Sequence, residues 1–233
     1  MDNLINLIFP PKCLMCSSVG TLVCRICLAT CKIVDPDICV VCEKNSILGI
    51  THTQCSSKTP VKRFITVFDY DGAVRKVIKT SKYRTKQFLA LKLLTKYGVN
   101  LLNAETLNYL RNSVLVPIPL NRAKEKARGF NQVDLICKEI AFKAGCKIAR
   151  TVLIRKKETL AQFENDRRAR FKNLESAFAL SEKARLLPKD TKLVIVDDIC
   201  TTGATVLEAA KTLNSFGFSD ISVFTLSKRF KRT

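Results

Sequence analysis

The sequence predicts an α/β fold in which a mostly parallel sheet carries helices on both faces, preceded by a small cysteine-rich module. Two observations support this. Apolar, β-branched segments alternate with amphipathic helical patterns after residue 60. Eight of the eleven cysteines lie within the first 55 residues. We therefore expect a metal-binding module over residues 1–58 and an α/β domain over residues 59–233.

The elements are predicted from hydrophobic periodicity, in chain order. An apolar segment at 4–9 predicts a short docking helix that ends at Pro10 and Pro11. Runs of β-branched and aromatic residues predict strands at 64–70, 114–119, 193–196 and 221–226. Apolar residues at helical spacing predict helices at 74–78, 88–97, 131–144 and 205–216, the last ended by Gly217. The basic segment 155–173 has weak apolar periodicity, which predicts a mobile loop or lid.

The most informative motif spans residues 193–205. A buried strand is predicted to end in Asp197 and Asp198, and a loop rich in hydroxyl groups then leads into a helix. Backbone N–H groups and the helix dipole make such a loop a phosphate cradle. The carboxylates would repel a phosphate but suit the hydroxyls of a sugar, so we expect a sugar phosphate to bind here. The candidate loop residues are Thr201, Thr202, Gly203, Ala204 and Thr205.

A simpler interpretation is that an aspartate at a strand end serves only as a turn residue or a helix cap. A single aspartate would fit that interpretation. Two adjacent carboxylates followed in register by Thr-Thr-Gly-Ala-Thr favour the phosphate site.

The N-terminal cysteines occur in pairs separated by two residues, a spacing that lets two ligands reach one tetrahedral zinc ion. His52, the single histidine of the chain, stands where a fourth such pair would begin. Sequential use of the pairs would form two structural zinc sites; interleaved use is an alternative, and Cys31 could replace a ligand. The candidate ligands are Cys13, Cys16, Cys24, Cys27, Cys39, Cys42, His52 and Cys55.

The chain carries 40 Lys and Arg against 20 Asp and Glu, a formal net charge of +20. This balance favours phosphate, nucleic acid or another polyanion as a partner. No apolar run approaches the roughly 20 residues of a membrane span, and no signal peptide is apparent, so we expect a cytoplasmic protein that uses its cysteines for metal. Basic side chains that could meet a pyrophosphate, or simply form a solvated surface, are Arg122, Arg128, Arg155 and Arg170.

Several motifs along nearly the whole chain resemble the competence protein F (ComF/GntX) family. They include Phe-Pro-Pro-x-Cys-x-x-Cys at 9–16, Tyr-Asp-Gly-x-Val-Arg at 70–75, Lys-Tyr at 82–83, Val-Pro-Ile-Pro at 116–119 and Arg-Gly-Phe-Asn-Gln at 128–132. The segment 193–205 also resembles the signature of type I phosphoribosyltransferases, which bind phosphoribosyl pyrophosphate (PRPP). His52 departs from the family, in which a cysteine is expected.

The resemblance implies a zinc ribbon joined to a phosphoribosyltransferase domain that binds PRPP with Mg²⁺ through Asp197 and Asp198. It also implies a role in handling single-stranded DNA during natural transformation, beside a helicase. Two hypotheses stay open: a phosphoribosyltransferase with an unknown acceptor, and a non-catalytic PRPP sensor that binds single-stranded DNA. Phe130, Phe163 and Phe171 could stack bases, although ordinary packing explains each of them as well. A third interpretation makes the ribbon a docking platform for a protein.

Overall fold

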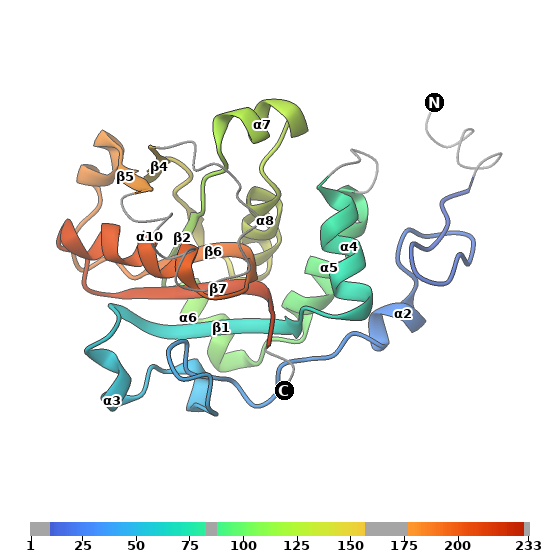
Figure 1. Ribbon diagram of the computed structural model, residues 1–233, viewed down its shortest axis with the longest axis horizontal. Helices are drawn as coiled ribbons and strands as arrows, with labels where there is room; N and C mark the ends of the chain where they lie inside the picture. Colours follow the sequence, from blue (N-terminus) through green and yellow to red (C-terminus); the bar gives the residue numbers. More distant parts are fainter. Residues whose placement is uncertain (1–9, 83–87, 157–176, 231–233) are drawn as a thin grey trace.

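The computed structural model describes residues 10–82, 88–156 and 177–230 of the chain. Its centre is a five-stranded sheet in the order β1-β7-β6-β2-β3 (Figure 1), and every neighbouring pair of strands is parallel. The predicted fold class is therefore confirmed. The strands are β1 (Val61–Asp69), β2 (Val114–Pro117), β3 (Lys147–Ile148), β6 (Leu193–Cys200) and β7 (Ile221–Lys228).

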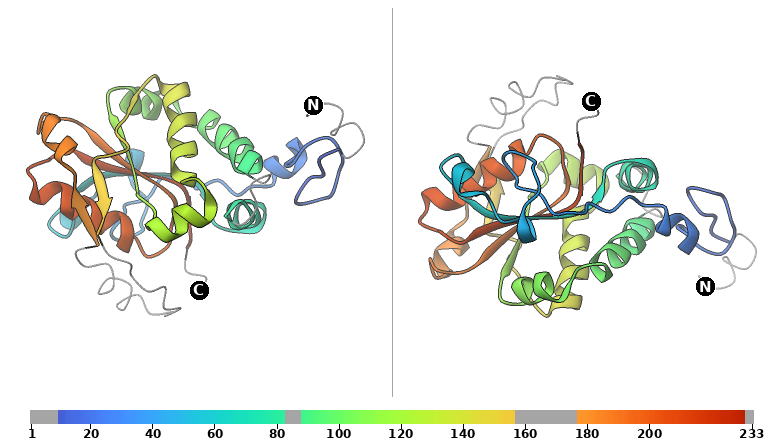
Figure 2. Two further views of the ribbon diagram at one scale, coloured as in Figure 1. Left: turned by 90° about the horizontal axis from the view of Figure 1, so that it is seen from above. Right: turned by 90° about the horizontal axis from the view of Figure 1, so that it is seen from below.

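Helices cover both faces of the sheet. Figure 2 shows the green helices on one side of the strands and the red helix α10 (Ala204–Ser215) on the other. The small antiparallel pair β4 (Leu153–Arg155) and β5 (Phe178–Leu180) packs beside α10. The first face carries α4 (Gly72–Ser81), α5 (Phe88–Asn100), α6 (Ala104–Arg111) and α8 (Gln132–Ala144).

The burial of strand β6 on both faces explains why residues 193–196 are all apolar. Val194 and Val196 enter the core beneath the first face, whereas Leu193 and Ile195 enter the core beneath α10. A strand buried on both faces needs apolar side chains at successive positions. Each such side chain contributes about 1.5–3 kcal/mol when fully buried.

The cysteine-rich segment covers the outer edge of β1. Antiparallel bridges join Ile33 to Phe68 and Ile50 to Arg63, and this covers backbone groups that an edge strand otherwise exposes. Ile38 and Val40 belong to the core cluster beneath α10. A domain boundary near residue 58 stays a prediction. The segment's short helices are α2 (Arg25–Ala29), η1 (Ile47–Gly49) and α3 (Thr53–Ser56).

The structure differs from the predicted elements at several places. Strand β6 continues to Cys200 instead of ending at Val196, because β7 also runs past its predicted end and keeps pairing with β6 as far as Lys228. Helices α6 and α7 (Arg122–Arg128), the short helices of the cysteine-rich segment and strands β3, β4 and β5 were not predicted. Arg155, expected at the start of a loop, ends β4. Helix α7 has too few apolar residues to show helical periodicity. Its ends are marked by Asn121 at the N-cap and Gly129 at the C-cap.

Two predicted segments fall partly or wholly outside the described residues. These are the proposed helix at 4–9 and, in the proposed lid, residues 157–173. The 3₁₀ helix η3 (Glu182–Leu186) follows β5. Of the helices described, none is both long and apolar enough to cross a membrane.

Candidate functional site

The sheet changes its direction of winding between β2 and β6. Helix α8 leads from β2 to β3 on one face, and α10 leads from β6 to β7 on the other. Ligands of open α/β sheets bind at the carboxyl ends of strands at such a switch point. The register between β2 and β6 ends at Pro117 and Val196, so Asp197 and Asp198 lie at that place.

The two carboxylates have different partners. Asp198 is 9% exposed, and its Oδ2 atom lies 2.9 Å from Nζ of Lys82, at the C-terminal end of α4. Asp197 is half-buried, and its Oδ1 atom accepts a hydrogen bond of 2.8 Å from the backbone N–H of Asp198. Strand β6 thus presents one carboxylate in an ion pair and one that accepts from the backbone of its neighbour.

These surroundings shift two pKa values. Burial, followed by the charge of Asp198, raises the pKa of Asp197 to about 7; the Asp198 N–H group, Lys82 and Arg155 oppose this rise. Burial by itself would lower the pKa of Lys82, but the charge of Asp198 and the hydrogen bond to it outweigh burial, and the pKa is raised. Asp197 therefore changes protonation near neutral pH.

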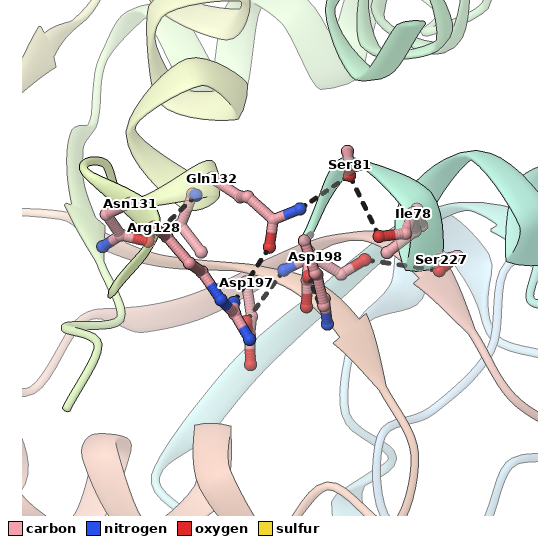
Figure 3. Close-up of polar contacts among 10 residues, drawn as sticks. Ile78, Ser81, Arg128, Asn131, Gln132, Asp197, Asp198 and Ser227 are labelled. Atoms are coloured by element: carbon pink, nitrogen blue, oxygen red, sulfur yellow. Dashed lines mark hydrogen bonds and ion pairs between the residues drawn. The ribbon is translucent and has the colours of Figure 1, made fainter. Parts of the chain in front are cut away.

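A polar network joins three elements around the acidic pair (Figure 3). Gln132, at the start of α8, is 2% exposed and donates through Nε2 to Oγ of Ser81 at 2.6 Å. Arg128 donates through Nη1 to Oε1 of Gln132 at 3.4 Å. Asn131 donates to the carbonyl of Ile118 at 3.0 Å and caps α8 through its Oδ1 atom. The motif at 128–132 thus fixes the loop after β2 against the end of α4.

The loop after β6 turns at a glycine directly before α10. Gly203 has φ of +81°, a left-handed conformation that favours glycine, and it precedes α10 as its N-cap without a side-chain capping bond. Thr202 Oγ1 accepts from the N–H of Ala204 at 3.3 Å. The N-terminus of α10 therefore presents backbone N–H groups and a positive dipole end beside the acidic pair.

The basic residues predicted to meet a pyrophosphate differ in where the structure places them. Arg128 belongs to the network described above, and Arg155 interacts electrostatically with Asp197 while its guanidinium lies 5.7 Å from the ring centre of Phe178. Burial lowers the pKa of Arg155, against the charge of Asp197. Arg122 begins α7, and Arg170 lies outside the described residues.

The proposed base-stacking aromatics gain no support. The ring of Phe130 packs edge-on against Phe88 with centroids 4.7 Å apart, which is ordinary packing. Phe163 and Phe171 lie outside the described residues.

The structure assembles the cysteine pairs sequentially into two groups of four ligands. Within each group the ligand atoms lie within 4.8 Å of one another, as one tetrahedral ion requires. The first group includes Cys24 and Cys27 at the start of α2, and the second includes His52 and Cys55 at α3; these two helices lie well apart in Figure 1. Cys31 is in neither group; its thiol points to the carbonyl of Cys27 at 3.6 Å. The groups are Cys13, Cys16, Cys24 and Cys27, and Cys39, Cys42, His52 and Cys55.

The donor chemistry of both groups fits zinc. His52 Nε2 donates to the carbonyl of Asn45 at 3.0 Å, so the Nδ1 lone pair faces Cys42 Sγ at 3.2 Å. Burial, followed by the neighbouring cysteines, raises the pKa of Cys27 to about 12 and that of Cys55 to about 11. Burial opposes ionisation of Cys13, but N–H donors outweigh it and lower its pKa to about 6. A bound cation would relieve the crowding of thiolates.

Sequence reasoning did not assign three residues of this region. Lys82 follows a predicted helix and belongs to the Lys-Tyr motif at 82–83. That motif was the sequence signal that could have assigned Lys82 to the site. Gln132 was noted only as part of the motif at 128–132. Lys228, the last residue of β7, is 2% exposed; no local pattern marks a buried lysine whose partners come from distant segments.

Comparisons with known proteins agree with this geometry. Residues 138–233 match the model of the phosphoribosyl transferase domain. The chain is 31% identical to DNA utilization protein YhgH of Salmonella typhi over 182 residues, 75% of this chain and 76% of that protein. It is 29% identical to YhgH of Escherichia coli K12 over 213 residues, 88% and 90% of the two chains. It is 30% identical to competence protein F of Haemophilus influenzae over 114 residues, 49% of each.

Fold and sequence match together define a protein with a phosphoribosyl transferase domain and a cysteine-rich N-terminal segment. The chain belongs to the family that contains the DNA utilization protein YhgH and competence protein F. The resemblance inferred from the sequence motifs is therefore confirmed.

Proposed function

We propose that this protein binds PRPP and is a phosphoribosyltransferase of the cytoplasm that acts in DNA uptake or nucleotide-related metabolism. The observation that carries the proposal is the place of Asp197 and Asp198, which lie at the switch point of the sheet directly before a glycine turn and the N-terminus of α10. The carboxylates would hold the ribose hydroxyls, and residues 201–205 would hold the 5′-phosphate.

The chemistry would consist of positioning and charge stabilisation. When bound, Mg²⁺ would neutralise oxygens of the pyrophosphate and of the acidic pair. Lys82 keeps Asp198 in place through the 2.9 Å ion pair, and Arg128 and Arg155 supply positive charge towards a leaving pyrophosphate. The acceptor of the phosphoribosyl group stays open.

Calorimetry with PRPP and Mg²⁺ tests the proposal. Wild type is expected to bind. Asp197→Asn combined with Asp198→Asn is expected to lower the affinity at least about 100-fold, because both carboxylates proposed to accept hydrogen bonds from the ribose hydroxyls lose their charge. Glu139→Gln is the matched control, since it neutralises a carboxylate paired with Lys92 on α5 and α8, away from the site. Equal affinity of wild type and the double variant would contradict the proposal.

The net charge of +20 and the names of the relatives favour a second candidate. In this alternative the protein binds PRPP without turnover and binds single-stranded DNA beside a helicase. Pyrophosphate release in a screen of acceptors separates the two candidates. Binding of single-stranded DNA should weaken with salt by a logarithmic slope of about −0.7 per phosphate contacted, and binding that ignores salt would exclude this candidate.

A further inference from the structure

Lys228 lies buried beneath the loop that follows β6. Its side chain is 3% exposed, and its Nζ donates to the carbonyl oxygens of Thr201 and Arg229, each at 2.9 Å. The remaining donor faces Oε1 of Glu43 at 3.1 Å. A buried ammonium group costs several kcal/mol unless it is paired and hydrogen-bonded, so this arrangement uses every donor of the lysine.

Glu43 comes from the turn that carries two ligands of the second cysteine–histidine group. Its backbone has φ of +58°, and its N–H donates to the carbonyl of Cys39 at 2.9 Å. The N–H of Cys39 in turn donates to the carbonyl of Lys44 at 2.9 Å. The position of the Glu43 side chain therefore depends on the same turn that positions Cys39 and Cys42.

Lys228 acts on the first peptide of the phosphate turn. In a trans peptide the carbonyl of one residue and the N–H of the next point in opposite directions. Because Lys228 holds the carbonyl of Thr201 from the buried side, the N–H of Thr202 points to the opposite side, where the proposed phosphate would lie.

We propose that Glu43 and Lys228 form a buried brace through which the second cysteine–histidine group holds the Thr201–Thr202 peptide in the orientation that binds phosphate. The identity of the bound ligand, PRPP, rests on the proposed function. The brace makes both residues positioning residues, since neither would touch PRPP. It also connects the metal-binding segment to the ligand site, two regions that the sequence presents as separate.

Three variants test the brace: Glu43→Ala, Lys228→Met and the two combined. Hydrogen exchange of amides 199–205 without ligand reports the loop, calorimetry reports PRPP affinity, and urea unfolding reports stability. Each single variant is expected to speed loop exchange and to lower PRPP affinity about tenfold. The double variant should recover stability, because no unpaired buried charge remains, but it should not recover affinity, because the ammonium group of Lys228 no longer orients the Thr201 carbonyl.

The controls separate positioning from general destabilisation. Glu139→Ala breaks a lysine–carboxylate pair with a separation of 3.9 Å on α5 and α8 and should leave loop exchange and affinity unchanged. His52→Ala should remove metal from the second group and reproduce the fast exchange of Glu43→Ala.

Two results would overturn the brace. One is unchanged loop exchange in Glu43→Ala, Lys228→Met and His52→Ala. The other is a double variant that regains affinity together with stability. If wild type itself fails to bind PRPP, the proposed function fails, and loop exchange alone then decides whether the brace exists.

Discussion

Asp197 occupies a position where burial and a neighbouring like charge both oppose ionisation. Its partner Asp198 instead meets the ammonium group of Lys82 at 2.9 Å. Adjacent residues of one strand point to opposite faces of the sheet, so two identical side chains acquire different surroundings. This difference suits a site in which one carboxylate is held in place and the other responds to a ligand.

The raised pKa of Asp197 makes stability depend on pH. The folded value of about 7 exceeds the unfolded value of about 4, so the folded protein holds the proton more tightly. For this group, stability is greatest below about pH 4 and declines as pH rises to 7. Relative to wild type, Asp197→Asn should therefore gain unfolding free energy between pH 4 and 7 and stay level above 8.

Urea unfolding of both proteins across this range measures the difference. Both carry the same metal ligands, so any loss of metal at low pH affects them equally. A difference that stays constant from pH 4 to 8 would show that Asp197 titrates normally.

At the scale of the element, the turn before α10 has a backbone conformation that favours glycine. Gly203 has φ of +81°, whereas a Cβ atom added there would make only ordinary contact with Leu207 Cδ1, at 3.4 Å. Non-glycine residues pay about 1–2 kcal/mol in this conformation. The turn before α10 therefore depends on glycine for its shape.

Gly203→Ala is expected to lower stability by about 1–2 kcal/mol and to weaken PRPP binding about tenfold or more, because the N–H groups of the turn shift. Gly145→Ala is the matched control. Gly145 has φ of +75° at the C-cap of α8, and a Cβ atom added there would have no neighbour within 4 Å, so this variant should lose similar stability and keep its affinity. Thermal unfolding and calorimetry provide the two readouts; equal losses of affinity would argue against a phosphate turn.

Local signals predicted some elements and missed others. The apolar run of β6 and the periodic apolar face of α8 could be predicted from the sequence, because in each element the apolar positions are the buried ones. Helix α7 was missed because its charged residues leave no periodic pattern. The extension of β6 to Cys200 was missed because it depends on the length of β7.

At the scale of the whole molecule, the cysteine-rich segment is part of the core. Cys13 and Cys27 pack in the cluster beneath α4, α5 and α8, and Ile38 packs in the cluster beneath α10. Loss of metal should therefore destabilise the α/β domain as well as the segment.

Metal analysis of protein purified without chelators is expected to find two zinc ions per chain. Cys27→Ser should lose about one ion and unfold at a lower temperature, by about 2–4 °C for each kcal/mol lost. Cys146→Ser is the control, since Cys146 lies in neither ligand group, and it should retain both ions. Two retained ions in Cys27→Ser would contradict the assignment.

The sequence by itself determined the alternation of strands and helices, the closely spaced cysteine pairs, and the acidic pair next to its glycine turn, because each of these lies within a few neighbouring residues. Only the tertiary structure decided which distant groups meet. Lys82 reaches Asp198, Gln132 reaches Ser81, and Glu43 reaches Lys228. These contacts follow from the strand order and from the path of the N-terminal segment, which depend on packing of the whole chain and leave no local pattern.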